Sequence, residues 1–175
     1  MITLSRARIL TLARRGARDE TSRRWARGER RLKVRLARRR ARGTLYLTRR
    51  ELCWIGEWKT PRIRPQIARN TEPGVRGLTE AAFLIRDEGR RLRVLLSLPG
   101  VGIAVASVIL HFADPARYPI YDVRVRAALR RAGYRRPFPP TPDGWQVYAR
   151  TLRDLAARHR VSLRTLDKAL WQVGG

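Results

Sequence analysis

The sequence predicts an all-α protein, and three observations support this. Apolar residues recur at the spacing of one helix face, as at Leu163, Leu166 and Leu170 near the C-terminus. Residues that cap helices, among them Thr48 and Ser162, stand before such segments. No segment shows the alternation of apolar and polar residues that is typical of a half-buried strand. With 175 residues, of which 43% are hydrophobic, the chain can form one or two small domains with a buried core.

The N-terminal part is the most basic region of the chain. A short helix is expected around residues 9–13, and a second, densely charged helix around residues 25–36. The run ARRRARG, residues 37–43, is either an arm that contacts DNA or the solvated face of this second helix, and the sequence favours neither. We therefore distinguish an Arg-rich N-terminal helical segment, residues 1–47, from a domain that spans residues 48–175.

The next helix has a clear start signal. Thr48-Arg49-Arg50-Glu51 is a Thr-x-x-Glu capping box before an apolar stretch, and the helix it opens should end near Thr60-Pro61. Glu72-Pro73-Gly74 is expected to form a turn. The apolar stretch 78–85 is expected to be a helix that Thr79 or a nearby residue opens.

The second half of the chain predicts a helix pair and three further helices. Residues 92–98 and 103–112 form the pair, and Asp114-Pro115 ends it. Residues 123–131 are an amphipathic helix. The proline-rich stretch 135–144 is expected to be a linker or long loop between this helix and the last two, which span residues 145–159 and follow Ser162.

The net charge is extreme for a globular protein. It amounts to +26, from 40 lysines and arginines against 14 acidic residues. A field of this sign attracts polyanions, so nucleic acid is the first candidate partner and an anionic membrane surface the second. Only three of the 40 basic residues are lysines, namely Lys33, Lys59 and Lys168. A GC-rich genome would explain arginine in place of lysine, but not the excess over acids.

The chain has a single cysteine, Cys53, which limits the disulfides and metal sites that it can form. One cysteine allows no disulfide within the chain and no cysteine-ligated zinc or iron–sulfur site, which fits a reducing cytoplasm. No apolar run is long enough for a signal peptide or a membrane span. We therefore expect a cytoplasmic, nucleoid-associated protein that binds no metal.

The helix pair is interrupted by an unusual turn within SLPGVGIAVASVILHF, residues 97–112. Gly100 and Gly102 let the backbone bend and approach a partner closely. The helix that follows begins with a partial positive charge at its N-terminus. Together these features predict a seat for a DNA phosphate. The alternative is a plain corner between two helices.

Two motifs at a fixed separation resemble a known family. Leu98-Pro99-Gly100-Val101-Gly102 with Ala106, followed by Tyr118-Pro119-Ile120-Tyr121-Asp122, is similar to the helix-hairpin-helix Gly/Pro–Asp superfamily of base-excision DNA glycosylases. Asp122 follows Gly102 by 20 residues, much as in endonuclease III-like and adenine-glycosylase-like members. The resemblance covers residues 92–129 and does not specify a substrate.

This resemblance implies a compact helical glycosylase-like fold, with the hairpin at 92–112 and a catalytic loop at 115–123. The family's aspartate corresponds to Asp122, which would stabilise the cationic sugar as the N-glycosidic bond breaks. Asp122 could equally cap the helix that begins at Val123, and the two roles are compatible. The residues expected at the DNA backbone are Leu98, Pro99, Gly100, Val101, Gly102, Ala104, Arg124 and Arg126. The two arginines could equally be ordinary surface charge.

The resemblance also bears on the reaction type. Bifunctional members carry a lysine two residues after the last hairpin glycine, where this chain has Ala104. Lys59 could supply an amine only if the fold brings it to the pocket, which the sequence does not predict. We therefore expect a monofunctional glycosylase. Iron–sulfur members of the superfamily carry four cysteines after the domain, whereas this chain has one in total, so we expect no cofactor.

The pocket for the extruded base is expected near the end of the helix that Thr48 opens. Glu57 could protonate a leaving purine, Trp58 could stack on the base, and Lys59 could hold a phosphate or base oxygen. The alternative places Trp58 in the core and leaves Glu57 and Lys59 solvated. Tyr121 is a further pocket candidate that would more commonly be a core residue.

The sequence therefore predicts a monomeric enzyme that acts on double-stranded DNA and removes a damaged or mispaired base. The main alternative is a non-catalytic helix-hairpin-helix module that binds nucleic acid, and a basic RNA-binding protein is a third possibility. The two histidines are too few for a metal cluster, and Asp167 and Lys168 are expected on the surface.

Overall fold

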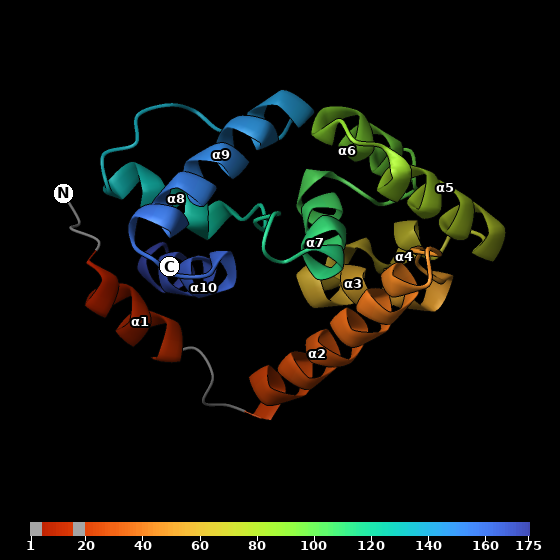
Figure 1. Ribbon diagram of the computed structural model, residues 1–175, viewed down its shortest axis with the longest axis horizontal. Helices are drawn as coiled ribbons and strands as arrows, with labels where there is room; N and C mark the ends of the chain where they lie inside the picture. Colours follow the sequence, from red (N-terminus) through yellow and green to blue (C-terminus); the bar gives the residue numbers. More distant parts are fainter. Residues whose placement is uncertain (1–4, 16–19) are drawn as a thin grey trace.

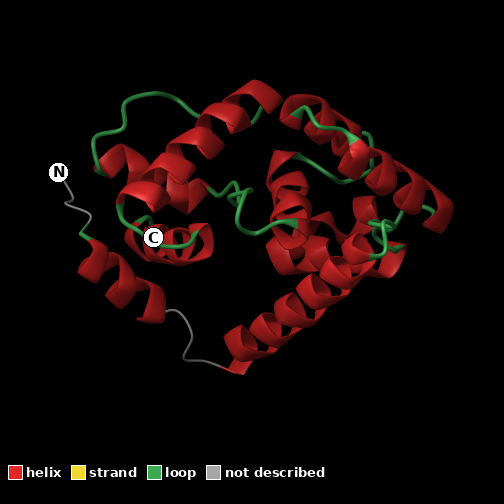
Figure 2. Ribbon diagram, viewed as in Figure 1, coloured by secondary structure: helices red, strands yellow, loops and turns green. Residues whose placement is uncertain are grey.

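The computed structural model describes residues 5–15 and 20–175, and within these ranges it contains helices and loops but no strand (Figure 2). The prediction of an all-α protein is confirmed. The helices are α1 (Arg6–Arg15), α2 (Glu20–Ala41), α3 (Arg49–Lys59), the 3₁₀ helix η1 (Pro61–Ile63), α4 (Arg64–Ile67), α5 (Glu72–Leu84), α6 (Glu88–Leu96), α7 (Ile103–Ala113), α8 (Val123–Arg131), α9 (Pro142–Arg158) and α10 (Leu163–Val173). Across the described residues, no helix combines the length and apolarity that a membrane span requires.

The helices form two groups (Figure 1). In one, α2, α3 and α6 pack around α7, and α5 packs on α6. In the other, α1, α8 and α9 pack on α10, and α6 contacts α9 between the two groups. Every residue of α7 except Ala104 is buried, because this helix is apolar on all sides. The helix after the 97–102 turn is therefore the centre of the first group.

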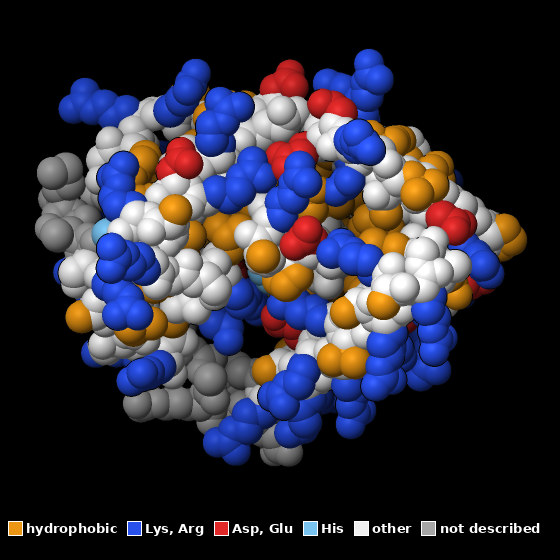
Figure 3. Space-filling model, in the orientation of Figure 1, with side chains coloured by type: hydrophobic (Ala, Val, Ile, Leu, Met, Phe, Trp, Pro, Cys, Tyr) orange, Lys and Arg blue, Asp and Glu red, His pale blue; other side chains and the backbone are white. Residues whose placement is uncertain are grey.

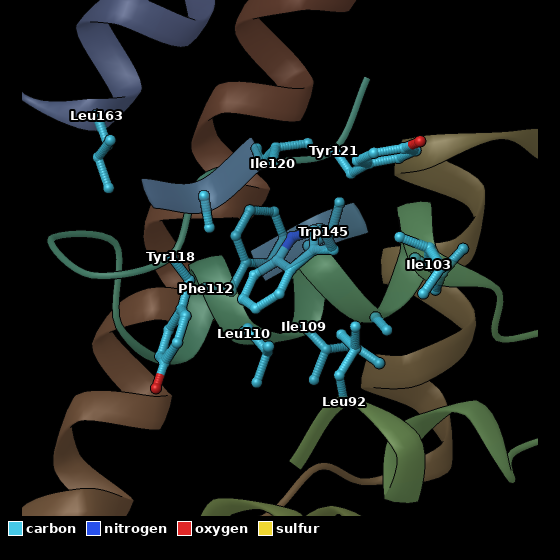
Figure 4. Close-up of a cluster of buried hydrophobic side chains, with 14 of the residues drawn as sticks. Leu92, Ile103, Ile109, Leu110, Phe112, Tyr118, Ile120, Tyr121, Trp145 and Leu163 are labelled. Atoms are coloured by element: carbon cyan, nitrogen blue, oxygen red, sulfur yellow. The ribbon is translucent and has the colours of Figure 1, made fainter. Parts of the chain in front are cut away.

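The hydrophobic core draws on the whole described chain. The N-terminal segment contributes Ile9, Leu32 and Leu36, each almost fully buried, to the same cluster as the later helices. The boundary at residue 47 stays a prediction. Around the start of α9, Trp145 stacks on Tyr118 with ring centroids 6.0 Å apart (Figure 4). These contacts join α9 to the loop that leads to α8.

Most predicted helix starts are confirmed. The Thr48 hydroxyl accepts a hydrogen bond from the Glu51 amide, and the Glu51 carboxylate accepts one from the Thr48 amide, so the capping box is formed. Ser162 caps α10, and Asp122 caps α8, which spans the predicted residues 123–131.

Some predicted starts are wrong. Helix α6 begins at Glu88, capped by Asp87, and not at residue 92. Glu72-Pro73-Gly74 is not a turn but the first turn of α5, which Thr71 caps. Thr79 lies buried within that helix, where its hydroxyl donates to the Val75 carbonyl and accepts from the Leu47 amide. Helix α9 likewise begins earlier than predicted, at Pro142 within the proline-rich stretch. Proline in a first turn loses no helical hydrogen bond, so it marks a start here rather than a loop.

Candidate functional site

The 97–102 turn joins α6 to α7 through a backbone that only glycine adopts readily. Gly100 has φ +76°, and a Cβ atom there would lie 2.8 Å from the backbone nitrogen of Ile67. Asn70 holds the turn from the same side, because its side-chain amide donates to the Pro99 carbonyl at 2.8 Å and to the Ile67 carbonyl at 2.7 Å. Asn70 was missed by the sequence analysis. The turn is thus fixed against α4.

The residues predicted to contact DNA at this turn differ in what they expose. Leu98 and Val101 are buried, and their amides already donate to the carbonyls of Leu95 and Leu98. Pro99 has no amide proton. Gly102 is exposed, and Ala104, in the first turn of α7, is partly buried. The backbone at Gly102–Ala104 is therefore compatible with the predicted role, whereas the amides of Leu98 and Val101 are already used within the turn.

The start of α7 offers donors to an anion. Among the described residues, no side chain caps this helix. The first amides of a helix lack partners within it and point along its axis. A Cβ atom at Gly102 would meet nothing within 4 Å, so the approach to these amides is open. The turn is therefore compatible with a phosphate at this end of α7.

Asp122 lies at the N-terminus of α8 and makes two hydrogen bonds. One carboxylate oxygen accepts from the Arg124 amide at 2.8 Å, and the other accepts from the Lys59 ammonium at 2.6 Å. The exposed fractions of the Asp122 and Lys59 side chains are 18% and 11%. The fold therefore brings Lys59 to Asp122, because the end of α3 packs beside the loop that precedes α8.

Two opposing effects set the charge of Asp122. Burial by itself raises the pKa of its carboxyl group. The charge of the Lys59 ammonium, its hydrogen bond and the bonds from the backbone of α8 together outweigh burial and hold the pKa of Asp122 below the ordinary value. Asp122 is therefore an ionised carboxylate at neutral pH.

The Asp122–Lys59 pair faces a cavity of about 370 Å³ between the two helix groups. Its walls come from α2, the end of α3, the loop before α8, and α10. The residues that matter most on these walls are Trp25, Trp58, Lys59, Asp122, Asp167 and Trp171. The volume lies in the range of small-molecule sites in proteins.

Three indole rings contribute to the cavity wall. Trp58 lines the cavity and also contacts the core, where its ring meets Phe112 edge-on with centroids 5.2 Å apart. This position combines the two alternatives that the sequence left open. Trp171 is exposed on α10, and the Arg124 guanidinium lies 4.1 Å from its ring centroid. Trp25 completes the set from α2. Such rings offer faces on which a planar base could stack.

A charged network on the cavity wall was missed by the sequence analysis. Arg164 donates to Glu29 at 2.8 Å and to Asp167 at 2.6 Å, and Glu29 also accepts from Lys33 at 2.7 Å. Asp167 is buried, so its predicted surface position is wrong, whereas Lys168 is exposed as predicted. A signal was present, because Asp167 falls on the apolar stripe of α10.

Burial also acts on Asp167. It raises the pKa of this carboxyl group, and Arg164 and Lys59 offset part of the effect. Burial and the neighbouring cation Lys33 lower the pKa of His111 to about 3, so this histidine is neutral and packed. Within the described part of the chain, no group of three histidine, cysteine or acidic residues could hold a metal ion.

Two predicted pocket residues lie elsewhere. Glu57 points away from the cavity, with a side chain 40% exposed and 4.0 Å from Arg64, because it faces another side of α3 than Lys59. Tyr121 is a core residue, whose hydroxyl donates to the Phe138 carbonyl at 2.6 Å. The same hydroxyl accepts from Arg126 at 2.8 Å, so Arg126 is held against Tyr121, while Arg124 is exposed.

Comparison with known proteins gives no further guide: no family model, no curated protein and no solved structure matches this chain.

Proposed function

We propose that the protein is a DNA glycosylase that hydrolyses the N-glycosidic bond of a damaged or mispaired base extruded from duplex DNA. The observation that carries this proposal is the Asp122 carboxylate, held ionised on the wall of a cavity that three tryptophans also line. In this proposal α6, the 97–102 turn and α7 form a helix-hairpin-helix element within a glycosylase-like fold. The enzyme would work as a monomer in the cytoplasm, at the nucleoid.

The cavity suits the chemistry of this reaction. As the bond between base and sugar breaks, positive charge develops at C1′ and the ring oxygen, and a fixed carboxylate nearby offsets it. Water adds to C1′, and the departing base takes up a proton. The helix cap on one Asp122 oxygen fixes the position of the carboxylate, which a flexible side chain would not achieve.

Affinity for the duplex would come from phosphate contacts. Lysine and arginine side chains cover much of the visible face, including the surface over α2 and α9 (Figure 3). The uncapped start of α7 would seat one phosphate at the 97–102 turn. Because such contacts release counterions, binding should weaken steeply as salt increases. Unstacking the target base costs free energy, which the phosphate contacts would offset. The extruded base would then enter the cavity.

The test is base release from a panel of duplexes. The panel carries uracil, thymine mismatches, hypoxanthine, 8-oxoguanine or adenine opposite it, and alkylated purines. We expect one class to give alkali-sensitive sites, and the Asp122→Asn variant to release that base at least about 100-fold more slowly. Asparagine keeps the helix cap, so the loss would report on charge rather than on folding. Undiminished release by the variant would contradict the role of Asp122.

A non-catalytic nucleic-acid-binding protein is the second candidate. One observation favours it: the positive charge of Lys59 offsets the negative charge of the Asp122 carboxylate, which the reaction needs to stabilise the cationic sugar. Under this alternative every duplex in the panel is bound tightly and none loses its base. Tighter binding to RNA than to duplex DNA would instead indicate an RNA-binding protein.

A further inference from the structure

Lys59 brings a primary amine to the wall of the cavity from an unexpected direction. Its ammonium lies 2.6 Å from Asp122, and both side chains line the same cavity. Bifunctional members of the superfamily that the sequence resembles carry their lysine two residues after the last hairpin glycine. This chain has Ala104 of α7 at that position. Two lysines line the cavity, Lys59 at the end of α3 and Lys168 on α10, and Lys59 is the one that donates a hydrogen bond to Asp122.

The end of α3 is held in place by several contacts. The Thr60 amide donates to the Gly56 carbonyl at 2.8 Å, and Pro61 prevents the helix from continuing. A Cβ atom at Gly56 would lie 2.6 Å from the Ile67 side chain, so this part of α3 packs closely on α4. Trp58 is anchored on Phe112. The backbone that carries Lys59 therefore has little freedom to leave the cavity.

The pair could simply be an ion pair that stabilises the fold. Exposed ion pairs contribute little, and burying two charges costs solvation that their attraction only partly returns. Glu51, which pairs with Arg39, is enclosed by protein and does not line the cavity. Lys59 and Asp122 instead share a cavity large enough for a ligand. A carboxylate by itself favours the charged form of an amine, so the case for reaction rests on position: the amine reaches the cavity, and the carboxylate beside it can accept a proton from the amine as the amine adds to a carbonyl carbon.

We propose that Lys59 is a nucleophile toward the open-chain aldehyde of an abasic deoxyribose, so that the protein also breaks the DNA strand at abasic sites. The inference rests on the proposed function for the presence of DNA at this cavity. Abasic aldehyde is the substrate class, whether produced by this site or by another glycosylase. The expectation of a purely monofunctional enzyme would then be wrong.

The reaction balances without a cofactor. The Lys59 ammonium gives a proton to the Asp122 carboxylate, and the neutral amine adds to C1′. Loss of water from this adduct leaves a protonated imine. Asp122 gives its proton to the departing water and, again a carboxylate, accepts the proton from C2′ while the phosphate oxygen leaves C3′. A C2′–C3′ double bond forms and the strand breaks. Water hydrolyses the imine and returns the Lys59 amine.

The experiment is borohydride trapping on a duplex that carries a preformed abasic aldehyde. Borohydride reduces the imine to a stable amine and leaves the protein covalently attached to DNA. Wild type should form this adduct, and Lys59→Arg should form at least about 100-fold less, because a guanidinium keeps the charge but not the nucleophilic amine. Lys168 is the other lysine on the cavity wall and so the competing amine; Lys168→Arg should be trapped like wild type, and loss of the adduct in this variant instead would assign the amine to Lys168 and overturn the inference.

Two further controls exclude simpler explanations. A duplex with a tetrahydrofuran residue, which has no aldehyde, should give no adduct with any variant. Lys59→Arg should bind this tetrahydrofuran duplex within about threefold of wild type and keep the wild-type unfolding temperature. Loss of the adduct would then report on the amine and not on folding or DNA binding.

The outcomes separate this inference from the proposed function. An adduct that Lys59→Arg forms as efficiently as wild type overturns the inference, as does the absence of an adduct with wild type. Base release without any adduct leaves the glycosylase proposal intact and removes the role of Lys59. An adduct that depends on Lys59, in a protein that releases no base from the panel, supports the inference and counts against the glycosylase proposal.

Discussion

Glu51 and Asp122 are two acidic residues at helix starts, and their surroundings differ. Glu51, in the first turn of α3, is 5% exposed and accepts from the Thr48 amide at 3.0 Å and from Arg39 at 2.6 Å. Asp122 caps α8, pairs with Lys59 and faces the cavity. An acidic cap in the sequence is therefore compatible with either role. What distinguishes them is whether the carboxylate is enclosed by protein or borders open space.

The largest effect on stability should come from neutralising the two carboxylates in turn. Glu51→Gln places an amide against a guanidinium in an enclosed site, and we expect it to lower the free energy of unfolding by about 2–4 kcal/mol. Asp122→Asn keeps the cap beside an open cavity, and we expect a change below about 1 kcal/mol. Urea unfolding of both variants gives the comparison. Equal losses would mean that Asp122 is as structural as Glu51.

A smaller difference is expected when the partner cations are removed. Arg39→Met deprives Glu51 of its closest charge and also removes a bond of 2.9 Å to the Tyr46 carbonyl. We expect it to cost about 2 kcal/mol of unfolding free energy. Lys59→Met leaves Asp122 with its bond to the Arg124 amide and access to the cavity, at a cost below about 1 kcal/mol. A larger loss for Lys59→Met than for Arg39→Met would reverse the comparison.

The smallest effect is a dependence on pH. The folded protein holds the pKa of Asp122 below its ordinary value of 3.8, so the unfolded chain binds the proton first as pH falls. The stability that Asp122 contributes is complete above the ordinary pKa and is lost as pH falls through the folded one. Asp122→Asn cannot titrate. As pH falls from 6 to 3, the urea midpoint of Asp122→Asn should therefore rise relative to that of wild type. A difference between the two midpoints that stays constant with pH would contradict the lowered pKa of Asp122.

Local patterns made most of the helices predictable. The Thr48–Glu51 box, the Ser162 cap and the span 123–131 were all predictable because each depends on residues adjacent in sequence. The errors at Pro73 and Pro142 have one cause. A proline in a helix's first turn resembles a loop signal unless the cap before it is recognised.

The candidate site was predictable only in part. Asp122 and the 97–102 turn were singled out from motif and spacing. Asn70, Glu29 and Arg164 carry no local signal that sets them apart from other polar residues of a basic chain. Asp167 had one, its place on the apolar stripe of α10. Tyr121 and Glu57 were wrongly placed because one residue along a helix or loop turns a side chain to another face.

The sequence by itself determined the helical class, the helix ends that capping residues mark, the strong positive charge and the need for glycine at position 100. The tertiary structure alone decided that the end of α3 meets the start of α8, and so that Lys59 reaches Asp122, which lies 63 positions further along the chain. The physical reason is range: caps and turns are settled by neighbours in sequence, whereas a cavity arises from how distant helices pack around the apolar helix α7.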